Sequence, residues 1–351
     1  MKSAERAALW VIATGVIAAG LYFLRQPLTQ FALALILWLA IDGLAEMLDR
    51  RIPFMPRALA LPLALLLILG LVALTAYVVI NNIAAITGDL GSYSTRLNQI
   101  LADAQRAIGI PGPTPTVEML LTRLDPARVA GEIGQGLQGF ASDTVFILIY
   151  LGFLFPAAGV MSEKFDLIFP ERDQREAARD VIARIRLSME RYLLTQTVIS
   201  VLITVLTYIT LRIVGLDNAL FWSFLIFFLN YIPTIGSIAA VVLTTAVALV
   251  QFPTLGPVAG VAIGVGVWQF VIGNFLQPRM TGDSLNLSAV VVLLALAIWG
   301  LIWGIAGAFL AAPLTVMLMI VLAEFKSTRW IAILLSADGR PTPNLTHVSK
   351  S

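Results

Sequence analysis

Long apolar runs alternate with short polar stretches along the whole chain. A helix needs about 20 predominantly apolar residues to cross a bilayer, and six uninterrupted runs reach or approach that length. The pattern therefore predicts an all-α polytopic membrane protein with about six full spanning helices. The predicted spans are residues 7–24, 28–44, 58–80, 144–161, 193–214 and 256–277.

Two further apolar runs are interrupted near their middle. The sequence FLNYIPTIGS, at residues 228–237, interrupts the run 219–250, and WGLIWG, at residues 299–304, interrupts the run 285–323. The arms of the first run have only about 15 residues, which is short for a full crossing. We predict two re-entrant helical hairpins that face opposite sides of the membrane. The second run has longer arms, so two ordinary spans are the alternative, which gives eight or more spans in all.

Polar segments divide the apolar runs into regions. Residues 81–140 mix polar and apolar positions and contain the sequence PGPTPT, which predicts amphipathic helices outside the membrane. Residues 162–192 hold seven basic and seven acidic side chains and predict a charged amphipathic helix. The predicted organisation is three spans in 1–80, an extramembrane segment 81–140, a fourth span in 141–161, the charged helix 162–192, a motif-rich transport half 193–326 and a tail 327–351.

Basic residues near the span ends predict the orientation, because cytoplasmic loops are enriched in Lys and Arg. Lys2, Arg6, the loop 46–57 and the segment 162–192 all fall on one side if the spans alternate. We therefore expect cytoplasmic N- and C-termini and a periplasmic segment 81–140. The first run also resembles a signal peptide, but the many spans that follow favour an uncleaved anchor.

Composition excludes several classes of function. The chain is 59% hydrophobic and 13% charged, whereas soluble domains carry about a quarter charged residues. Its net charge is only +2 and its basic residues lie in loops, so no nucleic-acid partner is expected. There is no cysteine, and the single histidine is His347 in the polar tail. Phosphate-loop, nucleophile-elbow and metalloprotease motifs are missing, so we predict no cofactor, no metal site and no enzymatic activity.

The interruption at FLNYIPTIGS predicts a polar site within an apolar wall. Pro233 lacks an N–H, and Gly236 tolerates dihedral angles that other residues avoid. A broken helix frees backbone groups, which membranes tolerate only where protein or a water-filled cavity satisfies them. Asn230, Tyr231 and Thr234 add polar side chains beside the break. A loop at the membrane surface is the alternative.

Three stretches resemble signatures of the autoinducer-2 exporter family, also described as PerM-type permeases. NYIPTIG at 230–236 resembles the family's NYIPxIG. QPRMTGDSLNLS at 277–288 resembles its EPR…G…LGLSPL, and LLALAIWGLIWGIAGAFLAAPLT at 293–315 resembles its FWGxLWGxxGxxLAVPL. The motif-level resemblance covers about residues 190–325, and the remainder agrees only in layout.

Two positions depart from the family pattern. Gln277 stands where many relatives have Glu, and Ala289 stands where many have Pro. Gln277 removes a carboxylate that could titrate, which puts proton coupling at that position in doubt.

The resemblance implies a secondary transporter of the inner membrane. It implies export of autoinducer-2 or a related small polar metabolite, an elevator-like movement of the hairpins, and a homo-oligomer, specifically a pentamer. The predicted substrate-binding residues are Asn230, Tyr231, Thr234, Ser237, Asn274, Gln277, Arg279 and Trp303. The predicted hairpin-shaping residues are Pro233, Gly236, Gly300, Gly304 and Pro313.

Two alternative functions stay open. A cation/proton antiporter on the same fold would need ionisable groups within the membrane, which are default functional candidates. The candidates for ion coupling are Asp42, Asp143 and Asp283. The second alternative is a membrane scaffold or accessory subunit without transport activity, which would use residues 81–140 and 162–192 as its interaction surfaces.

Overall fold

The structure is a computed structural model, and it describes residues 3–51, 56–88, 90–109, 126–281 and 286–341. Within these ranges the secondary structure is helical, apart from one isolated bridge between Leu287 and Ser336. The prediction of an all-α protein is confirmed. The PGPTPT sequence and Asp283 lie outside the described residues.

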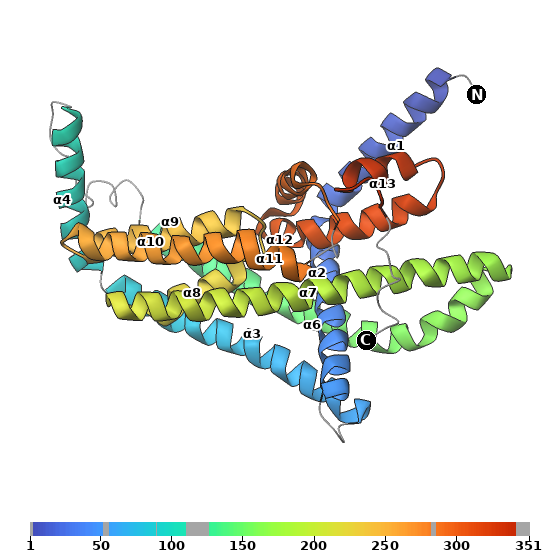
Figure 1. The fold of residues 1–351 in the computed structure, drawn as a ribbon, viewed down its shortest axis with the longest axis horizontal. Helices are drawn as coiled ribbons and strands as arrows, with labels where there is room; N and C mark the ends of the chain where they lie inside the picture. Colours follow the sequence, from blue (N-terminus) through green and yellow to red (C-terminus); the bar gives the residue numbers. More distant parts are fainter. Residues whose placement is uncertain (1–2, 52–55, 89, 110–125, 282–285, 342–351) are drawn as a thin grey trace. The chain divides into compact units, whose positions relative to one another are not determined.

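Figure 1 shows the described helices in their order along the chain. The first half of the chain forms α1 (Ser3–Phe23), α2 (Arg25–Arg51), α3 (Arg57–Gly88), α4 (Leu90–Ile108) and α6 (Pro126–Ile168). The second half forms α7 (Arg172–Val214), α8 (Ala219–Leu229), α9 (Ile235–Gln251), α10 (Leu255–Val271), the π-helix η1 (Ile272–Leu276), α11 (Gln277–Thr281), α12 (Ala289–Glu324) and α13 (Arg329–Leu335).

Five of the described helices are long and apolar enough to cross a membrane. They lie in α2, α6, α7, the continuous stretch Leu255–Met280, and α12. Helices α1 and α3, with 21 and 32 residues, also have the length of a crossing. The prediction of a polytopic membrane protein is confirmed.

Helices α6 and α7 each join two segments that the sequence treats as separate. The predicted charged helix 162–192 and the predicted fifth span meet within α7, which has 43 residues. No Pro or Gly stands anywhere in α7, so nothing in the sequence ends the helix between them. A helix of that length is about 65 Å long, roughly twice the thickness of the hydrocarbon core.

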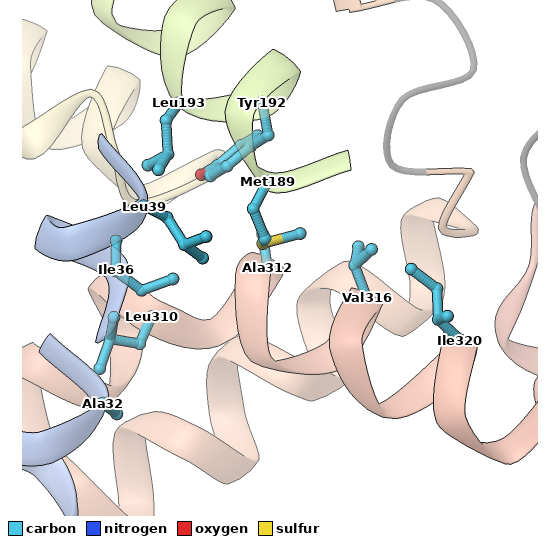
Figure 2. Close-up of a cluster of buried hydrophobic side chains, with 10 residues drawn as sticks. All are labelled: Ala32, Ile36, Leu39, Met189, Tyr192, Leu193, Leu310, Ala312, Val316 and Ile320. Atoms are coloured by element: carbon cyan, nitrogen blue, oxygen red, sulfur yellow. The ribbon is translucent and has the colours of Figure 1, made fainter. Parts of the chain in front are cut away.

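The chain divides into two compact units. Unit 1 comprises Met1–Leu61, Thr144–Thr195 and Met280–Ser351, and unit 2 comprises Pro62–Asp143 and Gln196–Arg279. The core of unit 1 is formed by α2, α7 and α12, which bury side chains at helical spacing (Figure 2). These side chains are Ala32, Ile36, Leu39, Met189, Tyr192, Leu193, Leu310, Ala312, Val316 and Ile320.

Unit 2 has its own core. One cluster brings together Leu211 of α7, Ala248 of α9 and Val261 of α10. A second cluster packs Ile203 of α7 against Ile226 of α8. Helices α8 and α9 are thereby held against α7 and α10, which positions the connection between them.

Candidate functional site

The helix breaks within FLNYIPTIGS, as its Pro and Gly pattern predicts. Helix α8 ends at Leu229 and α9 begins at Ile235. Gly236 is buried, and a Cβ at this position would overlap the carbonyl oxygen of Leu229. Thr234 adopts φ 63° and ψ −54°, a conformation that is a genuine outlier for a β-branched residue. The connection is therefore a tight turn that only glycine permits at position 236.

Gln251 closes the other end of this hairpin. Its side-chain Nε2 donates to the carbonyl oxygen of Gly215 at 3.0 Å, and its Oε1 accepts from the backbone N–H of Asp217 at 2.8 Å. The residues that precede α8 and the residue that ends α9 therefore lie side by side. Helices α8 and α9 form an antiparallel hairpin, and residues 230–234 are its tip.

Three polar residues of α7 hold the tip. The Gln196 Nε2 donates to the carbonyl oxygen of Asn230 at 2.7 Å. The Asn230 Nδ2 donates to the Ser200 Oγ at 3.0 Å. The hydroxyls of Thr197 and Tyr231 lie 2.8 Å apart and share a hydrogen bond. Because Gln196 and Ser200 are buried, this network satisfies part of the backbone that the helix break exposes.

The tip keeps unused hydrogen-bonding capacity. An Asn side chain offers two N–H donors and a carbonyl acceptor, and the network above uses one donor of Asn230. Thr234 is exposed, and its carbonyl oxygen accepts from the Ser237 Oγ at 2.9 Å. The aromatic ring of Tyr231 packs edge-on against Phe227 with centroids 5.7 Å apart. The tip therefore combines fixed polar groups with an aromatic wall.

The π-helix η1 and the short helix α11 carry three more of the predicted substrate-binding residues, namely Asn274, Gln277 and Arg279. The Asn274 side chain stands on η1, is exposed, and donates to the Phe270 carbonyl oxygen at 2.9 Å. The Gln277 Nε2 makes a long, weak hydrogen bond of 3.5 Å to Gln196 Oε1. Arg279 is exposed on α11. Gln196 thus connects position 277 to the hairpin tip, and π-helical turns are frequent at functional sites.

Helix α12 is a second hairpin, and Gly304 is its bend. Gly304 has φ 64° and ψ −143°, outside the helical region. The Trp299 Nε1 donates to the Thr315 Oγ1 at 3.2 Å, although a straight helix would separate these residues by about 24 Å. The first arm, residues 289–303, is only about 22 Å long, shorter than the roughly 30 Å hydrocarbon core. Of the two predicted alternatives, the structure favours the hairpin over two full spans.

The predicted shaping residues of the second hairpin have different surroundings. A Cβ at Gly300 would lie 3.9 Å from the Ala308 Cβ, an ordinary contact. Pro313 is buried within the second arm. The close approach occurs at Gly307, where a Cβ would overlap the carbonyl oxygen of Trp299. Sequence reasoning missed Gly307, although its GIAG context is the kind of small-residue pattern that permits close packing.

Trp303 contacts α1. Its Nε1 donates to the Leu21 carbonyl oxygen at 3.2 Å, and its ring lies 5.0 Å from that of Trp299. These contacts belong to unit 1, whereas Asn230, Asn274, Gln277 and Arg279 belong to unit 2. That Trp303 shares one substrate site with the first tip stays a prediction.

Asp42, a candidate for ion coupling, belongs to a cluster of charges between α2 and α7. It is buried and forms an ion pair with Arg186. The same guanidinium lies 2.7 Å from a carboxylate oxygen of Glu190 and 3.6 Å from one of Glu46. A buried carboxylate requires such a partner. Asp143 is half-buried in α6, and within the described ranges no cluster of three or more acidic or histidine side chains is arranged to hold a metal ion.

Sequence reasoning missed Gln196, Thr197, Ser200 and Arg186. Gln196 and Thr197 had a detectable signal, because they follow Thr195 in a run of three consecutive polar residues near the start of an apolar run. Arg186 is one of seven basic residues in a charged segment, and nothing in its local sequence distinguishes it.

A multi-pass helical protein with two broken helices has the architecture of many membrane transporters. A family model described as "AI-2E family transporter" matches residues 11–327, and the chain belongs to this family. The prediction from the NYIPTIG and related motifs is therefore confirmed.

Similar proteins from bacteria agree with this assignment. A "Putative transport protein" of Haemophilus influenzae is 31% identical over 340 residues, which cover 94% of this chain and 96% of the relative. The "AI-2 transport protein TqsA" of Escherichia coli is 28% identical, with 92% of each chain covered. A "Putative transport protein" of Borreliella burgdorferi is 33% identical over 60% of this chain and 58% of its own. These relatives carry the names of transport proteins, in agreement with the expectation that the chain is not an enzyme.

Proposed function

We propose that the protein is a secondary transporter that exports a small polar molecule across the inner membrane. One observation carries the proposal: the polar tip of the first hairpin is held by Gln196, Thr197 and Ser200, of which Gln196 and Ser200 are buried. In an apolar bundle, such a concentration of hydrogen-bonding groups beside a broken helix suits a polar solute. The name of the Escherichia coli relative suggests autoinducer-2 or a related metabolite as the substrate.

Binding would use groups that the tip already holds in place. A hydroxyl of the solute would bond to the Asn230 side chain and to the freed backbone near Thr234, while the rings of Phe227 and Tyr231 would cover its apolar edge. Transport would follow from an elevator-like movement of the hairpins within a homo-oligomer, proposed as a pentamer. Both termini would be cytoplasmic and residues 81–140 periplasmic.

Substitution of Asn230 tests the site. The Asn230→Ala variant loses the side-chain groups that bind the solute, and we expect its export to fall about tenfold, since a lost hydrogen bond of this kind is worth about 1–1.5 kcal/mol. The measurement is efflux of a panel of small polar metabolites from proteoliposomes, with and without an imposed proton gradient. Asn81→Ala, at an exposed position of α3, is the matched control. Equal efflux from wild type and Asn230→Ala would show that the substrate does not bind at this tip.

Cation/proton antiport is the second candidate function, because Asp42, Glu46 and Glu190 gather around the single Arg186. If Asp42 carries ion coupling, Asp42→Asn abolishes sodium-driven proton movement in proteoliposomes, and Asp143→Asn serves as the parallel test of the other described candidate. If Asp42 only pairs with Arg186, Asp42→Asn lowers thermal stability and leaves the movement per folded protein unchanged. Sodium movement without metabolite efflux in wild type would favour antiport over export.

A further inference from the structure

The short helix α13 presents a mixed apolar and basic face to its surroundings. Trp330 and Leu334 are 62% and 66% exposed, and Ile333 is 42% exposed. Arg329 is exposed at the start of the helix, and Lys326 is exposed in the turn that precedes it. Ala332, on the opposite face, is fully buried. Helix α13 is therefore held by one side and unpartnered on the other within the described part of the chain.

The surroundings of α13 place it at the polar base of the apolar α12 hairpin. It follows Glu324, the last residue of α12, whose carboxylate lies 4.0 Å from the Arg184 guanidinium in the charged part of α7. Its far end is fixed by a hydrogen bond from the Ser288 N–H to the Leu335 carbonyl oxygen, 3.1 Å. The helix thus connects the beginning and the end of α12, close to the pair formed by Arg184 and Glu324.

We propose that this face of α13 lies in the headgroup layer of the bilayer and binds anionic phospholipid. The Lys326 and Arg329 side chains would contact lipid phosphates, and Trp330, Ile333 and Leu334 would enter the boundary of the acyl chains. This combination of an aromatic ring, aliphatic side chains and cations is that of interfacial helices. The inference rests on the membrane placement of α12 and not on the transported substrate.

Charge and continuity favour lipid over another occupant. Neither Lys326 nor Arg329 forms an ion pair with any residue that the structure describes, so both cations are available to anionic headgroups. The hairpin α12 is apolar enough to lie in a membrane, and only four residues separate its end from the start of α13. A second copy of the chain and a soluble protein are the occupants that the experiment has to separate from lipid.

The lack of cysteine in the chain allows a direct test. A single-cysteine variant, Leu334→Cys, is labelled with an environment-sensitive dye and reconstituted into phosphatidylcholine vesicles with and without phosphatidylglycerol. Quenching is measured with nitroxide phospholipids and with a water-soluble quencher. Asp173→Cys, exposed in the charged first turn of α7, provides the reference for a dye in water.

We expect the dye at position 334 to be quenched by lipid nitroxides and shielded from the water-soluble quencher, in contrast to the dye at position 173. We also expect anionic nitroxide lipid to be enriched near the dye, and the enrichment to fall about fivefold for each cation lost in Lys326→Gln and Arg329→Gln. Arg340→Gln, beyond α13, should leave the enrichment unchanged.

Three results would overturn the proposal. A dye at position 334 as accessible to water as the one at position 173 would place the face in solvent. A dye shielded from both quenchers would show that protein covers the face. Equal quenching by anionic and zwitterionic lipids, in wild type and in the Gln variants alike, would leave the two cations without a role in lipid binding. Size-exclusion profiles verify that each variant is folded, and Lys326→Gln alone suffices if Arg329→Gln does not fold.

Discussion

Single glycines close both hairpins, each against a backbone carbonyl. In the first hairpin Gly236 faces the carbonyl oxygen of Leu229, and in the second Gly307 faces that of Trp299. In both cases the carbonyl belongs to the end of the first arm and the glycine to the start of the second. The arms can approach this closely only where the side chain is a hydrogen atom.

Substitution of Gly307 should therefore be far more harmful than substitution of Gly300 in the same hairpin. The Cβ of Gly307→Ala overlaps the Trp299 carbonyl and forces the arms apart, which should cost about 1–3 kcal/mol as overpacking does. The Cβ of Gly300→Ala meets only Ala308, at 3.9 Å, and Ala has the better helix propensity. Thermal unfolding of the two variants in detergent measures the difference. Equal unfolding temperatures of Gly307→Ala and Gly300→Ala would mean that the tip accommodates the added methyl group without loss of stability.

Side-chain hydrogen bonds hold the two hairpins together at their bases, away from the tips. Gln251 joins the two ends of the first hairpin. In unit 1, residues 286–288 pair with residues 335–340, and the Asn286 Nδ2 donates both to the Asp338 carboxylate and to the Arg340 carbonyl oxygen at 2.7 Å. Each hairpin is thus fixed at its base by side-chain hydrogen bonds and has a tip with unusual backbone angles.

The base of the second hairpin should depend on pH through Asp338. The hydrogen bonds from the Asn286 side chain and the Arg340 backbone N–H lower the pKa of the Asp338 carboxyl below its usual value. Because the folded pKa is depressed, the contribution to stability is present above the unfolded pKa of about 3.9 and is lost as the pH falls through the folded pKa.

Hydrogen exchange of residues 335–340, corrected for the intrinsic rate, provides the measurement. Protection in wild type should be constant from about pH 5 to 8 and fall below about pH 4. Asp338→Asn should show, at every pH, the low protection that wild type shows only at acidic pH. Identical profiles for the two proteins would mean that the carboxylate does not stabilise the pairing.

The sequence predicts a structural feature where the residues that cause it are close together in the chain. The break at FLNYIPTIGS has a local cause in Pro233 and Gly236, and it was predictable. The fold of α12 was left open because Gly304 permits a bend without requiring one, and the deciding contact joins Trp299 to Thr315. Partners distant in sequence were not predictable: Gln196 is 34 residues from Asn230, and Asp42 is 144 residues from Arg186.

The charge distribution predicts the topology of the whole molecule. Arg172, Arg175 and Arg179 stand at the start of α7, where α6 turns into it, and Asp166 pairs with two of them. The described part of the 81–140 segment carries α4, whose Arg96 donates to the Pro253 carbonyl oxygen at 3.1 Å. By the positive-inside rule we propose that the first region is cytoplasmic, and an odd number of crossings between the two regions would then place α4 in the periplasm.

Labelling of single cysteines in a chain that has none of its own tests this topology. Asp103→Cys on α4 and Asp173→Cys on α7 both replace exposed carboxylates, so neither should disturb folding. In intact cells, a membrane-impermeant maleimide that passes the outer membrane should label Asp103→Cys and leave Asp173→Cys unlabelled until the inner membrane is permeabilised. The reverse labelling pattern would mean that the protein has the opposite orientation in the membrane. Labelling of both before permeabilisation would place α4 and the start of α7 on one side, which an odd number of intervening spans does not allow.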